Sequence, residues 1–448
     1  MNEPSFLAEV RAQYEAFPFP FRRPEDESQR LIVSEVDRLS KIDHGCFSGR
    51  RDFEQPIRIL VAGGGTGDAL VFLAEQLRGC PAELVYVDIS AASMAMAKAR
   101  MEARGLTCSK WVHGSILDLS PDELGLFQYI NCIGVLHHLA EPEAGLSCLR
   151  RVLADDGAMG LMLYGRHGRR HVYHVQRMMS LLCTGETRLQ DRLKIARQAL
   201  TELSASGIVG ISPEMAARLQ HQDFDTYLID TYLHEQDRPY TASEIHAFLA
   251  SAGLHLAEFT NFFGDKGRAT ALDYDPTLFF SHDDLMQRAA QLPEPERQDL
   301  AEILGSSISM HAFYATTRPD TVASIADPTL APYFPSTLGV EFRAALEQGL
   351  RELEVVFQSG LSRTFGFSGL AAATLAMVDG RRPIHTLVNL AIQAAPSEDA
   401  DRVVHSVLSG MDVLIQLGLL HLRDPALPSL SLDDDATIWT GGPLNWQR

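Results

Sequence analysis

The sequence predicts an α/β fold: a doubly wound parallel sheet with a helical insertion, followed by a small, mostly helical C-terminal domain. Short apolar runs alternate with helical periodicity from residue 57 onward, and a glycine-rich segment follows the first of these runs. Residues 336–448 carry mainly helical periodicity. Strands that alternate with helices at this spacing are typical of βαβ units and of a parallel sheet.

The composition argues against several classes of protein. The chain has 448 residues, with 58 Asp and Glu against 39 Lys and Arg and a formal net charge of −19. A general nucleic-acid binder needs an excess of cations to displace counterions, so this acidity argues against one. Hydrophobic residues make up 46% of the chain, which allows a sizeable core and excludes global disorder.

The sequence also indicates a compartment. No apolar run approaches the ~20 residues of a transmembrane helix, and the N-terminus lacks the basic and apolar regions of a secretory signal. The cysteines show neither CxxC pairs nor metal-ligand spacing, which favours reduced, mostly buried thiols. All of them lie before residue 184: Cys46, Cys80, Cys108, Cys132, Cys148 and Cys183. We expect a cytoplasmic protein with no membrane or nucleic-acid partner.

Residues 1–55 are predicted to form an N-terminal arm or cap. The segment is polar and contains the cluster Phe17-Pro18-Phe19-Pro20-Phe21. Proline is excluded from helix interiors and restricts the residue before it, so an extended arm is expected. Two roles stay open for it: a flap that folds over a bound ligand, or an aromatic anchor that pins the N-terminus to the sheet.

The sheet domain is predicted over residues 56–318. Its first strands are expected at residues 57–63, 83–90, 110–115, 127–135 and 158–165. Helices are expected at 68–79 and 91–105, each closed by a glycine. The strand at 158–165 is expected to follow a turn at Asp155-Asp156-Gly157.

The remaining segments complete this plan. Residues from 166 to about 235 show no strand signal and predict a helical insertion, after which a helix and strand at 241–260 and a strand at 307–317 complete the sheet. Four prolines indicate a linker before the C-terminal domain: Pro319, Pro328, Pro332 and Pro335. In that domain, residues 370–424 predict helix, turn, helix, helix and a short strand.

The motif that carries chemistry is Val61-Ala62-Gly63-Gly64-Gly65-Thr66-Gly67-Asp68, between a predicted strand and helix. A phosphate-binding P-loop would end in Gly-Lys-Ser/Thr, which is absent here, and a dinucleotide fingerprint would have glycine where Asp68 stands. A carboxylate repels pyrophosphate but suits an ammonium or sulfonium group, and S-adenosylmethionine (SAM) carries both. Asp88 ends the next strand, where an acid can accept hydrogen bonds from both ribose hydroxyls. A tight turn with no ligand is the alternative for the glycines.

The segments AGGGTGD, YVDIS, HGSILDL and NCIGVLHHL, in this order, resemble the class I SAM-dependent methyltransferases. The resemblance implies a Rossmann-like SAM-binding domain and the transfer of a methyl group to an oxygen or nitrogen nucleophile. It also implies a set of residues that contact SAM: Gly63, Gly64, Gly65, Thr66, Gly67, Asp68, Asp88, Ile89, Ser115, Ile116, Gly134 and Val135.

The candidates for catalysis are His137, after the fourth strand, and Tyr14 in the arm. Histidine can take a proton from a hydroxyl or amine, although packing or contact with the cofactor explains the pair His137-His138 at least as well. The segment RHGRRHVYHVQR at residues 166–177 is cationic and follows the fifth strand, so Tyr164, Arg166 and Arg170 are predicted to bind an anionic small-molecule acceptor. A solvated helix face is the alternative for this segment.

Two weaker patterns complete the hypotheses. The spacing of an acidic and histidine-rich run matches no regular metal site, so no metal is expected and a substrate lid or plain surface remains: His221, Asp223, Asp225, Asp230, His234 and Asp237. Residues 379–382, Asp-Gly-Arg-Arg, faintly resemble a turn of winged-helix-like modules. That module suggests a peptide or protein acceptor as the alternative, or a domain that only packs or dimerises. A non-catalytic SAM-binding regulator is a third possibility.

Overall fold

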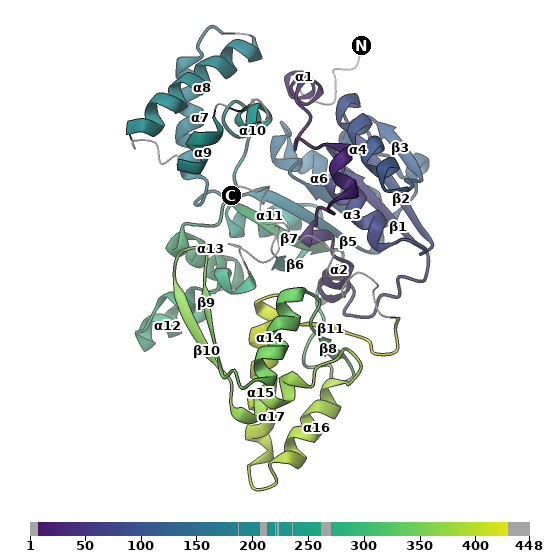
Figure 1. The fold of residues 1–448 in the computed structure, drawn as a ribbon, viewed down its shortest axis with the longest axis vertical. Coiled ribbons are helices and arrows are strands. Elements are labelled where there is room, and N and C mark those ends of the chain that lie inside the picture. The colour runs from purple at the N-terminus through teal and green to yellow at the C-terminus, as the bar shows by residue number, and fades with distance from the viewer. Residues whose placement is uncertain are drawn as a thin grey trace.

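A computed structural model of the chain describes residues 8–186, 188–206, 213–219, 221, 224–234, 236–260 and 270–428. A large twisted sheet flanked by helices occupies the middle of the molecule (Figure 1). A bundle formed by α7–α10 lies above one end of this sheet, and the helices α14–α17 lie below the other end (Figure 1). The structure therefore confirms the predicted α/β class and the mostly helical C-terminal part.

Seven strands form the central sheet in the order β3-β2-β1-β4-β5-β7-β6. The first five are parallel, and β7 runs antiparallel to both β5 and β6. The strand order reverses direction between β1 and β4, which is the point where doubly wound sheets bind ligands. The strands are β1 (Ile57–Ala62), β2 (Ala82–Asp88), β3 (Lys110–His113), β4 (Phe127–Ile133), β5 (Leu153–Tyr164), β6 (His255–Thr260) and β7 (Met310–Thr316).

Alternate residues of the central strands point to two separate cores. Leu60 packs in one core with Val85 and Ile130. Ile59 packs in the other core, with Tyr86. This period of two explains why the strands read as continuous apolar runs, since both faces are covered. The covering helices are α2 (Leu39–Cys46), α3 (Asp68–Gln76), α4 (Ala91–Ala103), α5 (Pro121–Leu124), α6 (Pro142–Arg151) and α11 (Ala242–Ser251).

The turn predicted at Asp155-Asp156-Gly157 is wrong, because these residues lie within β5. Phe127 pairs with Leu153 and Tyr129 pairs with Ala158, so β5 has four residues where β4 has one. The extra residues form an irregularity in the ladder and expose both aspartates. A run of acidic residues and glycine occurs both in turns and in bulges, so the sequence alone did not distinguish a bulge from a turn at this point.

The prediction of an extended arm over residues 1–55 holds only for its proline-rich part. Within the described residues, α1 (Ala8–Ala16) ends before Pro18, and residues 17–23 run without helix. Two 3-10 turns, η1 (Pro24–Ser28) and η2 (Glu35–Asp37), then lead into α2. The stretch AEVRAQYEA has good helix formers and no proline, so nothing prevents helix formation there.

The predicted insertion is helical and has a core of its own. Its helices are α7 (Arg170–Leu182), α8 (Leu189–Ser206), α9 (Pro213–Arg218) and α10 (Asp225–Tyr232). Val175, Leu200 and Leu228 are buried in this core, and Phe17 of the arm packs against it. The arm and the insertion thus lie on the same end of the sheet.

The C-terminal part contains the short strand predicted at its end, and also a hairpin and a partner strand that the sequence did not predict. The strands β9 (Glu352–Val356) and β10 (Ser362–Gly366) form the hairpin, and β8 (Ala331–Tyr333), in the predicted linker, pairs with β11 (His421–Arg423). The strands of the hairpin alternate exposed and half-buried residues over a short length, which gives a weak signal. Helices α14 (Thr337–Glu347), α15 (Gly369–Ala376), α16 (Ile384–Ala394) and α17 (Ala400–Gln416) complete this part, and α12 (Asp283–Ala290) and α13 (Glu294–Gly305) precede β7.

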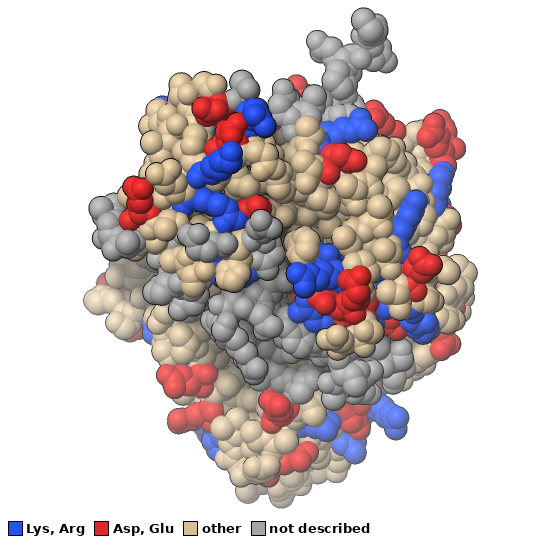
Figure 2. All heavy atoms as spheres, turned by 45° about the horizontal axis from the view of Figure 1, so that its top comes forward, with Lys and Arg blue, Asp and Glu red and all other residues tan. Residues whose placement is uncertain are grey.

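Charged side chains of both signs lie interspersed on the face seen in Figure 2, where the arm and insertion end of the molecule has come forward. Within the described part of the chain, no helix is both long enough and apolar enough to cross a bilayer.

Candidate active site

A cavity of about 1060 Å³ opens at the carboxyl ends of the central strands. Gly63 after β1, Asp88 at the end of β2, Gly134 after β4 and Tyr164 at the end of β5 all line it. Residues of α1, the arm and α10 close it from the other side. The volume is at the upper end of the range of small-molecule sites, so it offers room for a nucleoside-sized ligand and a second molecule.

The glycine-rich loop brings backbone to the cavity wall. Gly63 and Gly65 have φ angles of +68° and +51°, in the left-handed region that other residues rarely adopt. A Cβ atom on Gly65 would stand 2.7 Å from the carbonyl oxygen of Phe19, and one on Gly63 would stand 2.4 Å from the side chain of Val135. The loop therefore needs glycine both for its turn and for the close approach of the arm.

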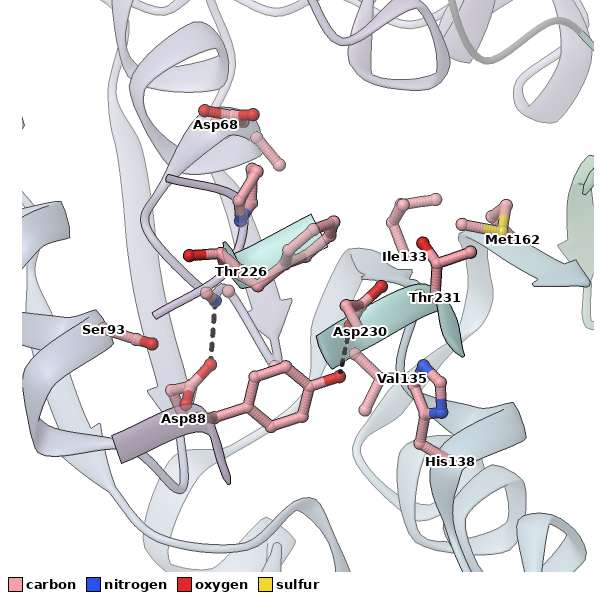
Figure 3. Close-up of a pocket in the computed structure, with 18 of the residues that line it drawn as sticks. Asp68, Asp88, Ser93, Ile133, Val135, His138, Met162, Thr226, Asp230 and Thr231 are labelled. Atoms are coloured by element: carbon pink, nitrogen blue, oxygen red, sulfur yellow. Dashed lines mark hydrogen bonds between the residues drawn. The ribbon is translucent and has the colours of Figure 1, made fainter. Parts of the chain in front are cut away.

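Asp88 fixes the loop and still has accepting capacity. One carboxylate oxygen accepts the N–H of Gly65 at 2.8 Å, and the other accepts the N–H of Ser90 at 2.8 Å. Burial raises the pKa of this carboxyl above its ordinary value, against the effect of these hydrogen bonds. Figure 3 shows Asp88 near Ser93, across the cavity from Asp230 and His138. A buried carboxylate with free lone pairs suits a ligand that donates hydroxyl hydrogens.

Asp68 lines the cavity but is paired with two arginines. Arg22 donates to both carboxylate oxygens, at 2.8 and 2.5 Å, and Arg100 donates at 2.6 Å. Although burial acts in the opposite direction, these two cations hold the pKa of Asp68 well below its ordinary value. Asp68 is therefore not the free carboxylate that the sequence predicted opposite an ammonium group, since Arg22 shares the same place on the wall.

The arm covers the loop directly. Thr66 donates its hydroxyl to the carbonyl of Pro20 at 2.7 Å and is buried away from the cavity. Phe19, Pro20 and Phe21 line the cavity beside the glycines. The arm thus forms part of the cavity wall, as the hypothesis of a flap over a ligand requires.

Of the two adjacent histidines, His138 rather than His137 lines the cavity. His137 is fully buried, and its ring lies 4.0 Å from that of Tyr164. His138 lies within hydrogen-bond distance of the carbonyl of Gln236, at 2.7 Å from Nδ1, so Nδ1 carries the hydrogen and Nε2 is an acceptor. Burial lowers the pKa of His138 to about 4, which keeps this ring neutral at pH 7.

Tyr14 lines the cavity and connects the arm to the insertion. Its hydroxyl donates to Asp230 at 3.0 Å, and Nε2 of His234 lies 3.2 Å from the same oxygen. Nδ1 of His234 accepts the N–H of Gln236, so its Nε2 carries the hydrogen and donates to Tyr14. Figure 3 shows Asp230 and His138 on the same side of the cavity, with a hydrogen bond to Asp230 dashed.

The predicted acceptor-binding arginines lie outside the cavity. Arg166 is half exposed and forms an ion pair with Glu244 at 2.6 Å, and Arg170 is exposed at the start of α7. The arginine of residues 166–177 that lines the cavity is Arg169, whose guanidinium lies 3.4 Å from the ring centre of Tyr164. Arg169 also pairs with Asp237 at 3.4 Å. The cationic segment therefore presents one arginine to the cavity, and it is not one of the two predicted.

Most of the residues predicted to contact the cofactor line the cavity, and two do not. Gly67 caps α3 and, like Thr66, is not on the wall. The remaining predicted cofactor residues line the cavity: Gly63, Gly64, Gly65, Asp68, Asp88, Ile89, Ser115, Ile116, Gly134 and Val135. Tyr14 and Tyr164 also line it, from opposite sides of Asp230.

Three side chains at this end of the cavity, of which His138 and Asp230 line the wall, have the atoms to ligate a metal ion. The ligand atoms of His138, Asp230 and His234 lie within 4.8 Å of one another. The two imidazole rings, however, are stacked 3.8 Å apart at an angle of 22°, so their lone pairs lie in nearly parallel planes. Two such lone pairs do not converge on one ion. Asp230 and His234 are instead linked through hydrogen bonds with Tyr14, and His138 bonds to the carbonyl of Gln236. Of the residues in the acidic run, Asp223 lies outside the described residues.

The comparisons with known proteins agree with this geometry. The methyltransferase domain family model matches residues 60–159. An uncharacterised protein of Synechococcus is 32% identical over 316 residues, which cover 69% of this chain and 72% of that protein. The chain belongs to the class I SAM-dependent methyltransferases.

Two further relatives add to the picture of this methyltransferase. The tRNA 5-carboxymethoxyuridine methyltransferase of Escherichia coli is 33% identical over 120 residues, covering 25% of this chain and 42% of that enzyme. The structure of PKMT2 from Rickettsia typhi in complex with AdoHcy has a TM-score of 0.57 at 14% identity and covers 90% of this chain and 77% of that one. At 14% identity, the similarity to PKMT2 shows a shared fold alone.

The residues of the methyltransferase fit its cofactor, SAM. The wall offers Asp88 with accepting capacity and a glycine loop that lines the cavity beside it. Sequence reasoning missed Arg22, Arg169, His138 and Asp230 as wall residues. Arg169, His138 and Asp230 stand within segments that the sequence did single out, but the choice among neighbours depends on which side chain a loop or short turn directs inward. Arg22 has no such local signal, because its partner Asp68 is 46 residues away.

Proposed function

We propose that this methyltransferase transfers the methyl group of SAM to an oxygen or nitrogen nucleophile of a small-molecule acceptor bound in the same cavity. The observation that carries the proposal is the cavity itself, which combines the glycine loop and Asp88 with a separate polar group around Asp230. When bound, SAM supplies a methyl group that its sulfonium already makes reactive. The chain then has to hold the two reactants in line and exclude water.

We assign the binding of SAM to the residues of the loop and of the strand ends. Asp88 would accept the ribose hydroxyls, and Ile89, Ser115 and Ile116 would lie along the adenine. Arg22, beside Asp68, would meet the carboxylate of the methionine part with an N–H that Asp68 does not engage, since hydrogen bonds from a guanidinium to a carboxylate are charge-assisted. Asp68 would hold the Arg22 guanidinium in place through their ion pair.

The position of the C-terminal part favours a small acceptor over a peptide or protein that this part recognises. Among the described residues, those that line the cavity end at Met310, so the wall includes none from β8 onward. Helices α14–α17 lie at the far end of the molecule from α1 and α10 (Figure 1). The name of the E. coli relative points to a tRNA acceptor, but the match covers only 25% of this chain and we do not extend it.

Mass spectrometry of a cell extract incubated with the protein and methyl-deuterated SAM tests the proposal. We expect at least one labelled small molecule that is absent when the protein is left out. Calorimetry should show SAM binding to the same preparation. If SAM binds and no component of the extract is labelled, the chain is a non-catalytic SAM-binding protein and the proposal is wrong.

A further inference from the structure

We propose that the acceptor is an aliphatic amine, which Asp230 binds as its ammonium form and from which Asp230 takes a proton. This inference rests on the proposed methyl transfer and names the acceptor class for that site. It gives a catalytic role to a residue that neither the glycine motif nor the comparisons assign.

Asp230 is a buried carboxylate on the cavity wall. It projects from α10 and is 3% exposed. One of its oxygens accepts the hydroxyl of Tyr14 at 3.0 Å, and the other accepts the hydroxyl of Tyr164 only at 3.5 Å. The second oxygen therefore has a weak partner and can accept a stronger donor from a ligand.

Among the residues that the structure describes, the charges near Asp230 leave it without a cation of its own. Arg169 and Asp237 act on it with opposite signs, and these two are paired with each other. Arg218, which also reaches the wall, lies over the ring of Phe224 at 5.0 Å. The hydrogen-bond donors to Asp230 are two neutral hydroxyls, so a cationic ligand would supply the positive charge that balances this carboxylate.

The surrounding side chains suit an ammonium group. The rings of Tyr14, Tyr164, Phe224 and Tyr227 line this end of the cavity, and aromatic faces attract cations. Burial keeps His138 and His234 uncharged, with the pKa of His138 lowered to about 4. These rings therefore do not repel a cation, and Nε2 of His138 can accept a second N–H.

The proposed step balances in atoms and electrons. An alkylammonium, with an ordinary pKa of about 10.4, gives one proton to the Asp230 carboxylate and becomes a neutral amine. The nitrogen lone pair then forms a bond to the methyl carbon of SAM. The bond between that carbon and sulfur breaks, and its electron pair stays on sulfur as a neutral thioether. The product is a methylated ammonium, and the proton on Asp230 leaves to solvent.

The buried setting favours that proton transfer. Moving the proton converts a buried ion pair into a neutral amine and a neutral carboxyl, and a low dielectric disfavours charged forms. Desolvation already raises the pKa of Asp230 to about 6, although the hydrogen bond from Tyr14 opposes it. A positive sulfonium nearby would also weaken the hold of the ammonium on its proton.

The first test compares Asp230→Asn with Asp225→Asn. Asparagine keeps the volume and can still accept the hydroxyl of Tyr14, whereas Asp225, on the same helix, pairs with Arg197 and does not line the cavity. Because a general base contributes about 10²–10⁴-fold, we expect Asp230→Asn to slow label transfer in extract by at least ~100-fold. Its Kd for SAM should stay within about threefold of the wild type, and Asp225→Asn should transfer label normally. Equal rates for the two variants would overturn the proposal.

The second test measures binding without turnover. Sinefungin carries an ammonium group where SAM carries its methyl sulfonium, and S-adenosylhomocysteine carries no charge there. We expect the wild type to prefer sinefungin by about tenfold in calorimetry, as a charge-assisted hydrogen bond implies, and Asp230→Asn to lose most of that preference. A preference that is unchanged in the variant would remove Asp230 from this position.

The labelled product separates the inference from the proposed function. A deuterated methyl group on an amine nitrogen supports both. A methyl group on a carboxylate or hydroxyl oxygen keeps the methyltransferase function but overturns the amine acceptor. Binding of SAM with no labelled product in extract overturns the proposed function, and the inference with it.

Discussion

At the scale of single residues, the site depends on which of two neighbours faces the cavity. His138 lines it and His137 does not, and Arg169 lines it while Arg166 and Arg170 do not. The motif NCIGVLHHL and the cationic segment located the right places on the sheet. They could not select the side chain, because in a 3-10 turn or at a helix start one residue changes the direction by about a third of a turn.

A buried carboxylate in the sheet also comes from a segment that is distant in the sequence. Asn131 in β4 donates to both carboxylate oxygens of Asp37, at 2.9 and 2.8 Å, and Tyr129 donates to Asp37 as well. The buried acid at this point of the sheet thus comes from a segment more than ninety residues away. Such a partner has no local pattern in the sequence.

The role of Asp230 as a base makes methyl transfer depend on pH. Below about pH 6 the raised pKa of Asp230 leaves it protonated, and a protonated carboxyl cannot take the acceptor's proton. The rate of label transfer should therefore fall about tenfold per pH unit below that midpoint and level off above it. In the described part of the chain, the other titratable or charged groups that face Asp230 are Tyr14, Tyr164, His138, His234, Arg169 and Asp237.

A pH series of labelling rates checks this expectation. Because burial keeps His138 and His234 neutral and the tyrosines protonated, none of them should titrate near pH 6. The same midpoint in Asp230→Asn would assign the titration to another group and count against the account.

At the scale of elements, a buried ionic network ties the arm to the glycine loop and α4. Arg100 is fully buried and donates to Glu27 of η1, to Asp68 and to the carbonyl of Thr66. Arg104 binds the other oxygen of Glu27 at 2.5 Å. The network explains why a polar N-terminal segment stays folded over the cavity.

Arg100→Met should lower the free energy of unfolding by about 3 kcal/mol, since removing one partner leaves buried charges uncompensated. Arg78→Met is the matched control, because Arg78 pairs with Glu75 at the surface and is 52% exposed. That pair should contribute less than about 1 kcal/mol. Denaturant unfolding of both variants measures the difference, and similar losses would contradict a stabilising role for the network.

The elements themselves were largely predictable. The strands from β1 to β4, α3, α4, α11, β6 and β7 follow from apolar runs, glycine stops and helical periodicity, because these local signals agree with the final packing. The bulge in β5, the helix α1 and the hairpin β9–β10 were missed. In each of them the local pattern fits two structures, and pairing or packing with distant residues decides between them.

At the scale of the whole molecule, the C-terminal part docks on the sheet domain away from the cavity. His44 of α2 accepts the N–H of Leu422 in β11 at 3.1 Å, and the rings of His44 and His421 stack at 5.2 Å. Arg50 forms ion pairs with Asp327 and Asp424 at the rim of this contact. None of these residues lines the cavity, so the junction is structural rather than catalytic.

Gly49→Ala tests the junction. A Cβ atom there would stand 2.6 Å from the carbonyl oxygen of Leu422, at a φ of +69°. Gly105→Ala is the control, with a φ of +62° and no atom within 4 Å of the added Cβ. We expect Gly49→Ala to cost about 1–3 kcal/mol more in the free energy of unfolding than the control does. The Kd for SAM should be the same in both variants, and a change confined to Gly49→Ala would connect the C-terminal part to the site.

The central claim is that SAM binds in the cavity with Asp88 as the acceptor of its ribose hydroxyls. Calorimetry of SAM binding to the wild type, Asp88→Asn and the exposed control Asp155→Asn tests it most directly. Losing one or two charge-assisted hydrogen bonds, at about 1.5–3 kcal/mol each, predicts a Kd at least tenfold higher for Asp88→Asn and no change for Asp155→Asn. Equal affinity of Asp88→Asn and the wild type would contradict the assignment of the site.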